Sequence, residues 1–126
     1  MLARIFMHED PKKSDIIKKG GDLCMKLLPT WNLTDGSIDM YYWYYATLAI
    51  FQMGSEYWAK WEKALDTSMV ANQRMEGTYC GFKGSWDPVD PWGPDGGRVY
   101  STAVLCMCLE VVYRYDQVFG TTTSKK

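Results

Sequence analysis

The sequence predicts an all-α protein made of tandem helical hairpins. Four segments, at about 14–28, 38–53, 56–74 and 99–115, carry the apolar spacing and the boundary residues typical of helices. They alternate between segments with one apolar side and segments that are apolar nearly all round, as expected when hairpins stack with one helix of each pair inside. Hydrophobic residues make up 47% of the 126 residues and aromatic residues 15%, too much for a disordered chain.

The chain opens on a short apolar stretch, Leu2 to Met7, which resembles the end of a helix that began elsewhere. We therefore expect a short N-terminal helix, and a piece of a longer protein is one of two alternatives for this chain, the other being a chain that associates with itself. The first ten residues contain no apolar core of a signal peptide.

The helix expected at about 14–28 begins with Ser14 as its N-cap and ends before Pro29. Gly20 and Gly21 weaken a helix, so either packing supports them or a close neighbour needs the room. The apolar residues are predicted to share one side, with most lysines elsewhere; they are Ile16, Ile17, Leu23, Cys24, Leu27 and Leu28.

The next two helices differ in kind. In the segment at about 38–53, the only polar side chains between Met40 and Phe51 are Thr47 and the tyrosine hydroxyls, which predicts burial on all sides. The segment at about 56–74 has one apolar stripe and a wet side; the stripe is Tyr57, Trp58, Trp61, Leu65 and Met69. We expect one domain, 1–126, with hairpins at about 14–53 and 56–117 and a flexible tail at 118–126.

The last helix, at about 99–115, is again apolar nearly all round, with Glu110 as the exception. Arg114 follows four residues later, the right distance for an ion pair. The stretch beginning at Tyr45 also resembles the one beginning at Tyr100, 55 positions on, which indicates a duplication. Neither apolar helix reaches the roughly 18–20 apolar residues that span a bilayer, so no membrane span is expected.

Charge and cysteine usage narrow the function classes. A net charge of −1 without a basic face argues against nucleic acid and against anionic membrane surfaces. The four cysteines form no CxxC pair, and Cys106 and Cys108 point to different sides of a helix, so we expect unpaired, buried thiols in a reducing compartment, with the cytoplasm favoured. With His8 as the single histidine, expected at the surface, the sequence predicts no metal site and no cofactor.

The segment from Asn72 to Gly97 contains three prolines and six glycines, and a loop this long is normally functional or packs as an element of its own. Asp87, Asp90 and Asp95 are its candidates for chemistry, beside Trp86 and Trp92. These carboxylates could bind calcium, act as an acid–base pair, or simply form turns and helix caps. Asp95 stands just ahead of the expected last helix, which favours a cap there.

The aromatic run at 41–45 allows three interpretations. With Trp43, Tyr44 and Tyr100 as candidate ligand-binding residues, it could line a cavity for an isoprenoid, where ring faces stabilise cations. It could stack on sugar rings. The simplest interpretation is core packing of a buried helix.

One pattern resembles a known family. Gln73, at the end of an outer helix, followed later by Gly84, Ser85 and Trp86, is similar to the Gln–Trp repeat of terpene cyclases and related toroids. The stretches at 39–47 and 96–103 are similar to bacterial prenyltransferase/squalene-oxidase-repeat proteins. The resemblance covers about 4–115 and implies a sector of an α/α toroid, in which Gln73 caps helix ends and stacks on Trp86.

The sequence departs from the family in two ways. The insertion from Thr78 to Lys83 makes the spacing of the motif longer than usual. The aspartate run D-x-D-D of alkene-protonating cyclases, the Asp, Cys and His zinc ligands of protein prenyltransferases and the Cys-Gly-Glu-Gln run of thioester toroids are all absent. The scaffold therefore predicts no catalytic residues, and fold alone does not supply an activity.

Three functions of different class remain open. The first is a non-catalytic repeat module for assembly or protein interaction, favoured by the missing motifs. The others are a binder or modifier of a hydrophobic isoprenoid-like ligand, and a carbohydrate-binding or carbohydrate-active toroid. Two hairpins cannot close a ring, so we expect a large exposed apolar patch, covered in a homo-oligomer or by the remainder of a longer toroid.

Overall fold

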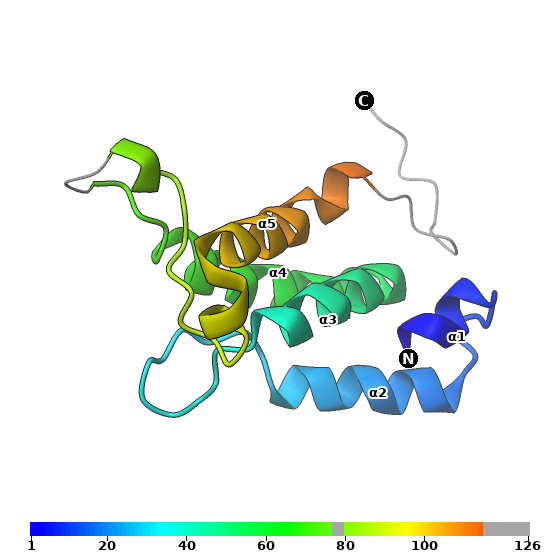
Figure 1. Cartoon of the computed structure of the whole chain (residues 1–126). Coiled ribbons are helices and arrows are strands. Elements are labelled where there is room, and N and C mark those ends of the chain that lie inside the picture. Colours follow the sequence, from blue (N-terminus) through cyan, green and yellow to red (C-terminus); the bar gives the residue numbers. More distant parts are fainter. Residues whose placement is uncertain (77–79, 115–126) are drawn as a thin grey trace.

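The computed structural model describes residues 1–76 and 80–114, which form five α-helices, one 3-10 turn and no strand (Figure 1). The all-α prediction is confirmed for these residues. The predicted flexible tail and the end of the second hairpin lie outside the described residues. The helices are α1 (Leu2–Phe6), α2 (Asp15–Lys26), α3 (Met40–Met53), α4 (Ser55–Val70) and α5 (Gly93–Arg114), and the 3-10 turn is η1 (Cys80–Phe82).

Helix α3 is the centre of the molecule. It contacts α1, α2, α4 and α5, and in Figure 1 it runs between α2 below and α5 above, with α4 behind. Two core clusters follow from this arrangement. One joins the first half of α3 to α4, α5 and the buried Trp86, and the other joins the second half of α3 to α1, α2 and Trp61 of α4.

Local signals place the helix boundaries close to where the sequence predicts them. The side chain of Ser14 accepts a hydrogen bond from the backbone N–H of Ile17, and Asp39 accepts one from Tyr42, so both residues are N-caps. A single residue, Gly54, separates α3 from α4, and its φ of 83° is a conformation that glycine adopts readily. Gly21 is buried, and Met53 packs so closely against it that a Cβ atom there would lie 2.5 Å from Cε of Met53.

The prediction for the buried side of α2 is wrong for three residues. Ile17 is fully buried and Cys24 and Leu28 are half-buried, but Ile16, Leu23 and Leu27 are 57%, 61% and 65% exposed. The apolar side of α2 is wider than the surface that α1, α3 and α4 cover. A stripe of apolar side chains, 16, 23 and 27, is therefore left in water.

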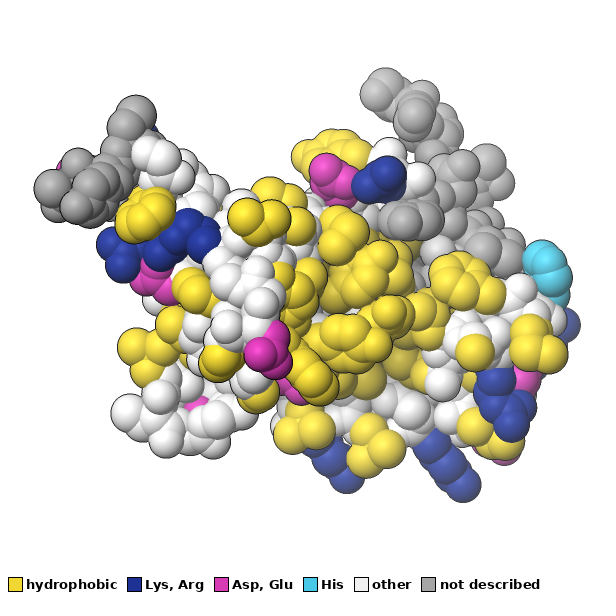
Figure 2. Space-filling model, viewed as in Figure 1, with side chains coloured by type: hydrophobic (Ala, Val, Ile, Leu, Met, Phe, Trp, Pro, Cys, Tyr) yellow, Lys and Arg dark blue, Asp and Glu magenta, His cyan; other side chains and the backbone are white. Residues whose placement is uncertain are grey.

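The two apolar helices are also not buried on all sides. Tyr41 and Tyr45 of α3 are 50% and 43% exposed, and Val99 of α5 is 82% exposed. Figure 2 shows hydrophobic side chains across the face formed by α3 and α5, with charged groups at its margins. The expected apolar patch is therefore present, because the described helices are too few to surround α3 and α5.

Other local predictions agree with the structure. Arg114 donates to Glu110 at 2.9 Å, in an exposed ion pair, and His8 is exposed. Cys108 is buried, and burial raises the pKa of its thiol to about 12, whereas Cys24 and Cys106 are half-buried. Across the ranges that the structure describes, no helix is both long enough and apolar enough to cross a bilayer.

Candidate functional site

The loop after α4 is packed onto the ends of α4 and α5 rather than left open. The indole nitrogen of Trp86 donates to the carbonyl oxygen of Met69, in the last turn of α4, at 2.7 Å, and the indole is 1% exposed. Nearby, the side-chain amide of Gln73 donates to the carbonyl oxygen of Gly84 at 2.8 Å. The two residues that carry the family resemblance, Gln73 and Trp86, therefore both fasten this loop to the end of α4.

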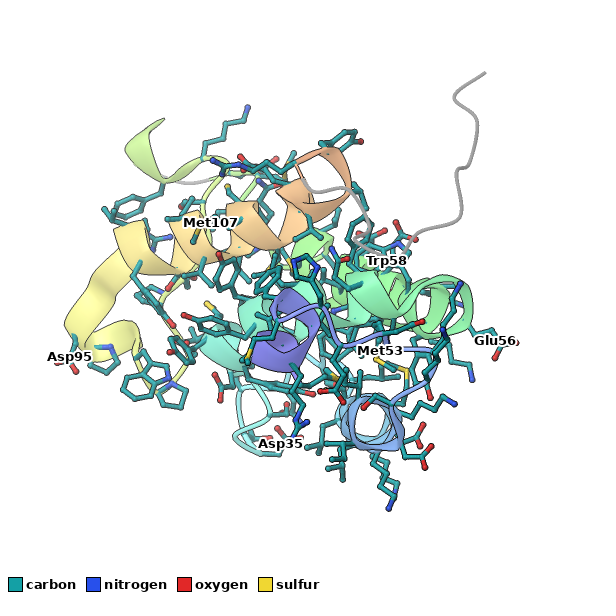
Figure 3. All side chains as sticks on the ribbon, turned by 90° about the vertical axis from the view of Figure 1, so that its right-hand side faces the viewer. Asp35, Met53, Glu56, Trp58, Asp95 and Met107 are labelled. Atoms are coloured by element: carbon teal, nitrogen blue, oxygen red, sulfur yellow. The ribbon has the colours of Figure 1, made fainter. Side chains whose placement is uncertain are left out.

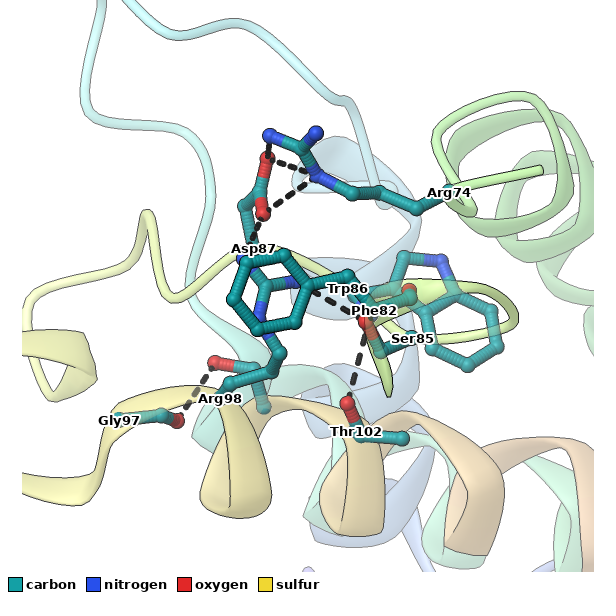
Figure 4. A network of polar contacts seen from close by, with 9 residues as sticks. Arg74, Phe82, Ser85, Trp86, Asp87, Gly97, Arg98 and Thr102 are labelled. Atoms are coloured by element: carbon teal, nitrogen blue, oxygen red, sulfur yellow. Dashed lines mark hydrogen bonds and ion pairs between the residues drawn. The ribbon is translucent and has the colours of Figure 1, made fainter. Parts of the chain in front are cut away.

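Asp87 is the centre of an ion-pair network at the same place (Figure 4). Arg74 binds its carboxylate through two nitrogens, at 2.7 to 3.0 Å, and Arg98 binds it from the other side. Arg98 also donates to the hydroxyl of Ser85 and lies over the ring of Phe82, 4.3 Å from its centre. Hydrogen bonds from Arg74 hold the pKa of Asp87 below its usual value.

This network has a structural role. Both oxygens of Asp87 accept hydrogen bonds from guanidinium groups of the same chain, and two neighbouring cations disfavour the approach of a metal ion. Arg74 follows α4 and Arg98 begins the regular part of α5, so the carboxylate joins the two helices of the second hairpin.

Asp90 has a different environment. It is 3% exposed, its Oδ2 accepts a hydrogen bond from the hydroxyl of Tyr100 at 3.2 Å, and its Oδ1 has no hydrogen-bond partner among the described residues. Burial raises the pKa of the Asp90 carboxyl, and the carboxylate of Asp39 acts in the same direction. The backbone N–H groups of Met40 and Gly93 lie close enough to oppose this effect in part. The same burial raises the pKa of Tyr100.

An aromatic group covers the start of α3. The ring of Tyr41 lies 4.8 Å from that of Tyr45 and 6.0 Å from that of Trp92, and the rings of Tyr44 and Tyr45 are 5.1 Å apart. Tyr41, Tyr45 and Trp92 are each about half exposed. We call these three residues the aromatic face.

The predicted site residues fall into separate groups. Asp90 and Tyr100 are in contact, and Trp92 lies beside Tyr41 at the start of α3. Trp86 and Asp87 belong to the loop anchor. Trp43 is buried in the core against Trp31, so neither Trp43 nor Trp86 offers a ring face to a ligand at the surface.

The structure corrects the expected cap at Asp95. Helix α5 begins at Gly93, earlier than predicted, and Asp95 lies exposed in its first turn, at the edge of the molecule in Figure 3. A break at Gly97, with φ 61° and ψ −165°, separates this turn from the regular helix. We predicted that Asp95 precedes the helix because the segment around it is rich in proline and glycine, which are unfavourable in helices.

Two grooves of the surface are lined by residues that the sequence did not single out as site candidates. A groove of about 580 Å³ lies between the 28–31 segment and α4, with Trp31, Lys60 and Lys63 among its lining residues. A second groove, of about 310 Å³, lies between α4 and α5. Both grooves form where segments distant in sequence pack together, so no local sequence signal could have identified their lining residues.

No protein-family model, curated protein or solved structure matches this chain. Within residues 1–76 and 80–114, no three His, Cys, Asp or Glu side chains come together in a group that could hold a metal ion. A functional proposal for this chain therefore rests on its surfaces and internal contacts.

Proposed function

We propose that this chain is a non-catalytic helical-repeat module that associates with further copies of itself. The observation that carries the proposal is the aromatic face. Three half-exposed rings leave roughly 300 Å² of aromatic surface in water, given about 150–250 Å² for a complete side chain. That area is at the lower end of the largest apolar patch on a typical monomer, and such patches are often functional.

The composition of this face suits a contact with an identical surface. Tyr41, Tyr45 and Trp92 carry no charge, so two such faces meet without charge repulsion. Tyrosine and tryptophan are the residues that most often dominate binding energy in interfaces. Rings held against one another, as Tyr41 is held between Tyr45 and Trp92, lose little freedom on binding.

The chemistry of the predicted acidic residues supports a non-catalytic role. Asp87 is held by two arginines, and Asp90 lies beneath the surface with Tyr100 as its hydrogen-bond partner. The similarity of 39–47 and 96–103 to toroid repeats agrees with this proposal, since hairpins of that type bury their inner helices against neighbouring repeats. We propose the toroid-like arrangement on this basis.

Solution mass tests the proposal directly. Light scattering on a size-exclusion column is expected to give a discrete oligomer at about 100 μM, because that concentration exceeds the Kd of most specific contacts. Tyr45→Ser is expected to weaken association at least about tenfold, a loss of roughly 1.4 kcal/mol. The matched control is Leu33→Ser, which removes an exposed apolar side chain from the loop before α3. A wild-type chain that stays monomeric contradicts the proposal.

A second candidate, binding of a hydrophobic ligand, is favoured by the groove of about 580 Å³, which has the size of a small-molecule site. Leu28, Pro29, Trp31 and Ala64 give it an apolar lining. Native mass spectrometry of the same chromatographic peak distinguishes the two functions. A stoichiometric apolar molecule, whose binding is lost in Trp31→Ala, supports ligand binding. An oligomer without any bound molecule contradicts ligand binding.

A further inference from the structure

The contacts of α4 show how one hairpin of this chain receives the next. Helix α4 lies against both α2 and α3 of the first hairpin. Its Trp61 is buried there and donates to the hydroxyl of Thr47 of α3 at 2.9 Å, while the hydroxyl of Tyr57 bonds Asp22 of α2 at 2.8 Å. The second hairpin therefore begins with a helix seated on the two helices before it.

The second hairpin offers an equivalent position that no described helix fills. Between α4 and α5 lies the groove of about 310 Å³, with an apolar lining from both helices. Figure 3 shows Trp58 in this region, between the start of α4 and the last turns of α5. The apolar lining residues are Trp58, Leu65, Cys108, Leu109, Val112 and Tyr113.

Two carboxylates give this groove a negative charge. Glu62 and Asp66, one turn apart on α4, are both lining residues. Neither forms an ion pair or a side-chain hydrogen bond with another residue in the described ranges. The groove therefore suits an apolar helix side flanked by basic residues.

Helix α2 has such a side. The exposed stripe Ile16, Leu23 and Leu27 lies next to Lys19 and Lys26, and neither lysine has an ion-pair partner within the described part of the chain. Along the lower edge of Figure 2, where Figure 1 places α2, hydrophobic and basic side chains alternate. Leu23 is the middle of the stripe, with one lysine about a turn away on either side.

We propose that α2 of one copy docks into the α4–α5 groove of another copy, in a head-to-tail contact. This inference rests on the proposed self-association and specifies one contact that produces it. Leu23 packs against the apolar lining, while Lys19 and Lys26 face Glu62 and Asp66. Since α2 and α5 lie on opposite sides of α3 in Figure 1, one copy offers its α2 and its groove at the same time.

A head-to-tail contact has a consequence that a symmetric contact lacks. The two surfaces that meet are different, so copies add one after another until a ring closes or an open chain results. A copy with a damaged α2 keeps its groove, and a copy with a damaged groove keeps its α2. Mixing the two is therefore expected to give a pair that cannot add further copies through this contact.

The test uses Leu23→Glu in the stripe and Val112→Glu in the groove, both at partly exposed positions. Each variant alone is expected to have a smaller solution mass than the wild type at about 100 μM, since each places a carboxylate in an apolar contact and leaves the aromatic face as the remaining contact. In native mass spectrometry, an equimolar mixture is expected to have a greater mass than either variant alone, because it restores the head-to-tail contact. Val70→Glu, at an exposed position outside both surfaces, is the matched control and is expected to keep the wild-type mass.

A charge exchange gives an independent readout. Lys19→Glu with Lys26→Glu is expected to weaken association at least tenfold, and adding Glu62→Lys with Asp66→Lys in the same chain is expected to restore it. Circular dichroism verifies that each variant folds. If Leu23→Glu associates like the wild type, or the mixture has no greater mass than either variant alone, the head-to-tail contact is wrong. If the Tyr45→Ser chain still associates more weakly than the wild type in that case, the proposed self-association survives; a monomeric wild type removes both proposals.

Discussion

The indole nitrogen of Trp86 lies 2.7 Å from the carbonyl oxygen of Met69, so a loop residue supplies the donor that the last turn of α4 lacks within its own helix. The ring is buried in the cluster formed by α3, α4 and α5. Trp92, six residues later, lies half exposed on the aromatic face. The two tryptophans of one loop therefore have different roles, and substitutions separate them.

We expect Trp86→Ala to cost about 3–5 kcal/mol of unfolding free energy, as for other large-to-small core changes, with the lost hydrogen bond included. Trp92→Ala is expected to cost less than about 1 kcal/mol, because its ring is half in water, and to weaken self-association instead. Urea unfolding and solution mass measure the two effects. Equal losses of stability in both variants would contradict this assignment.

The guanidinium groups around Asp87 predict a stability that depends on pH. Asp87→Asn is expected to destabilise the fold at pH 7 by roughly 1–2 kcal/mol, because a charged acceptor of both arginines is lost. The folded pKa of Asp87 lies below its unfolded value, so its contribution is present above the unfolded pKa and is lost as the pH falls through the folded pKa. The difference between wild type and variant should therefore shrink below about pH 4 in thermal melts. A difference that stays constant would show that the charge of Asp87 contributes nothing.

Gly93 tests the start of α5. A Cβ atom at this position would lie 2.3 Å from the carbonyl oxygen of Pro88, and a backbone atom cannot move aside as a side chain can. Gly93→Ala is expected to destabilise the protein by about 1–3 kcal/mol, in the range for overpacked positions. Gly81→Ala is the control, since nothing lies within 4 Å of its Cβ position. Similar melting temperatures for the two variants would contradict the close approach at Gly93.

Predictions from the sequence were confirmed where a feature depends on residues a few positions apart. Ser14 caps α2 through a residue three positions on, and Glu110 meets Arg114 one turn away. The stripe of Trp61, Leu65 and Met69 is buried, because an amphipathic helix with one narrow apolar side has one way to pack.

Predictions from the sequence were wrong or missing where packing between distant segments determines the structure. The apolar side of α2 is too broad to show which part α3 and α4 cover, so the exposure of Leu23 could not be predicted. Asp87 meets Arg74 and Arg98, which are 13 and 11 residues away in the sequence and belong to the segment just after α4 and to α5. The α4–α5 groove likewise exists only once the two helices are packed.

Asp90 is the buried acid whose charge is least compensated, and it gives the last prediction. Its folded pKa is raised, chiefly by burial, so the stability that it contributes is present below the unfolded pKa and is lost as the pH rises through the folded pKa. Asp90→Asn keeps the shape and removes the charge. We therefore expect the variant to be more stable than the wild type at pH 7, by about 1 kcal/mol on the scale of an unsatisfied buried acceptor, and to lose this advantage near pH 4.

Tyr100→Phe is the companion variant, because it removes the hydroxyl that bonds Asp90 Oδ2 and leaves the carboxylate with still fewer partners. It is expected to lower stability at pH 7 by roughly 1–2 kcal/mol and to matter less when Asp90 is already Asn, so the two changes should not add. Thermal melts of the single and double variants at pH 4 and pH 7 provide the comparison. If Asp90→Asn is destabilising at both pH values, then the carboxylate is stabilised in the fold by its surroundings, and the view of Asp90 as an uncompensated buried acid is wrong.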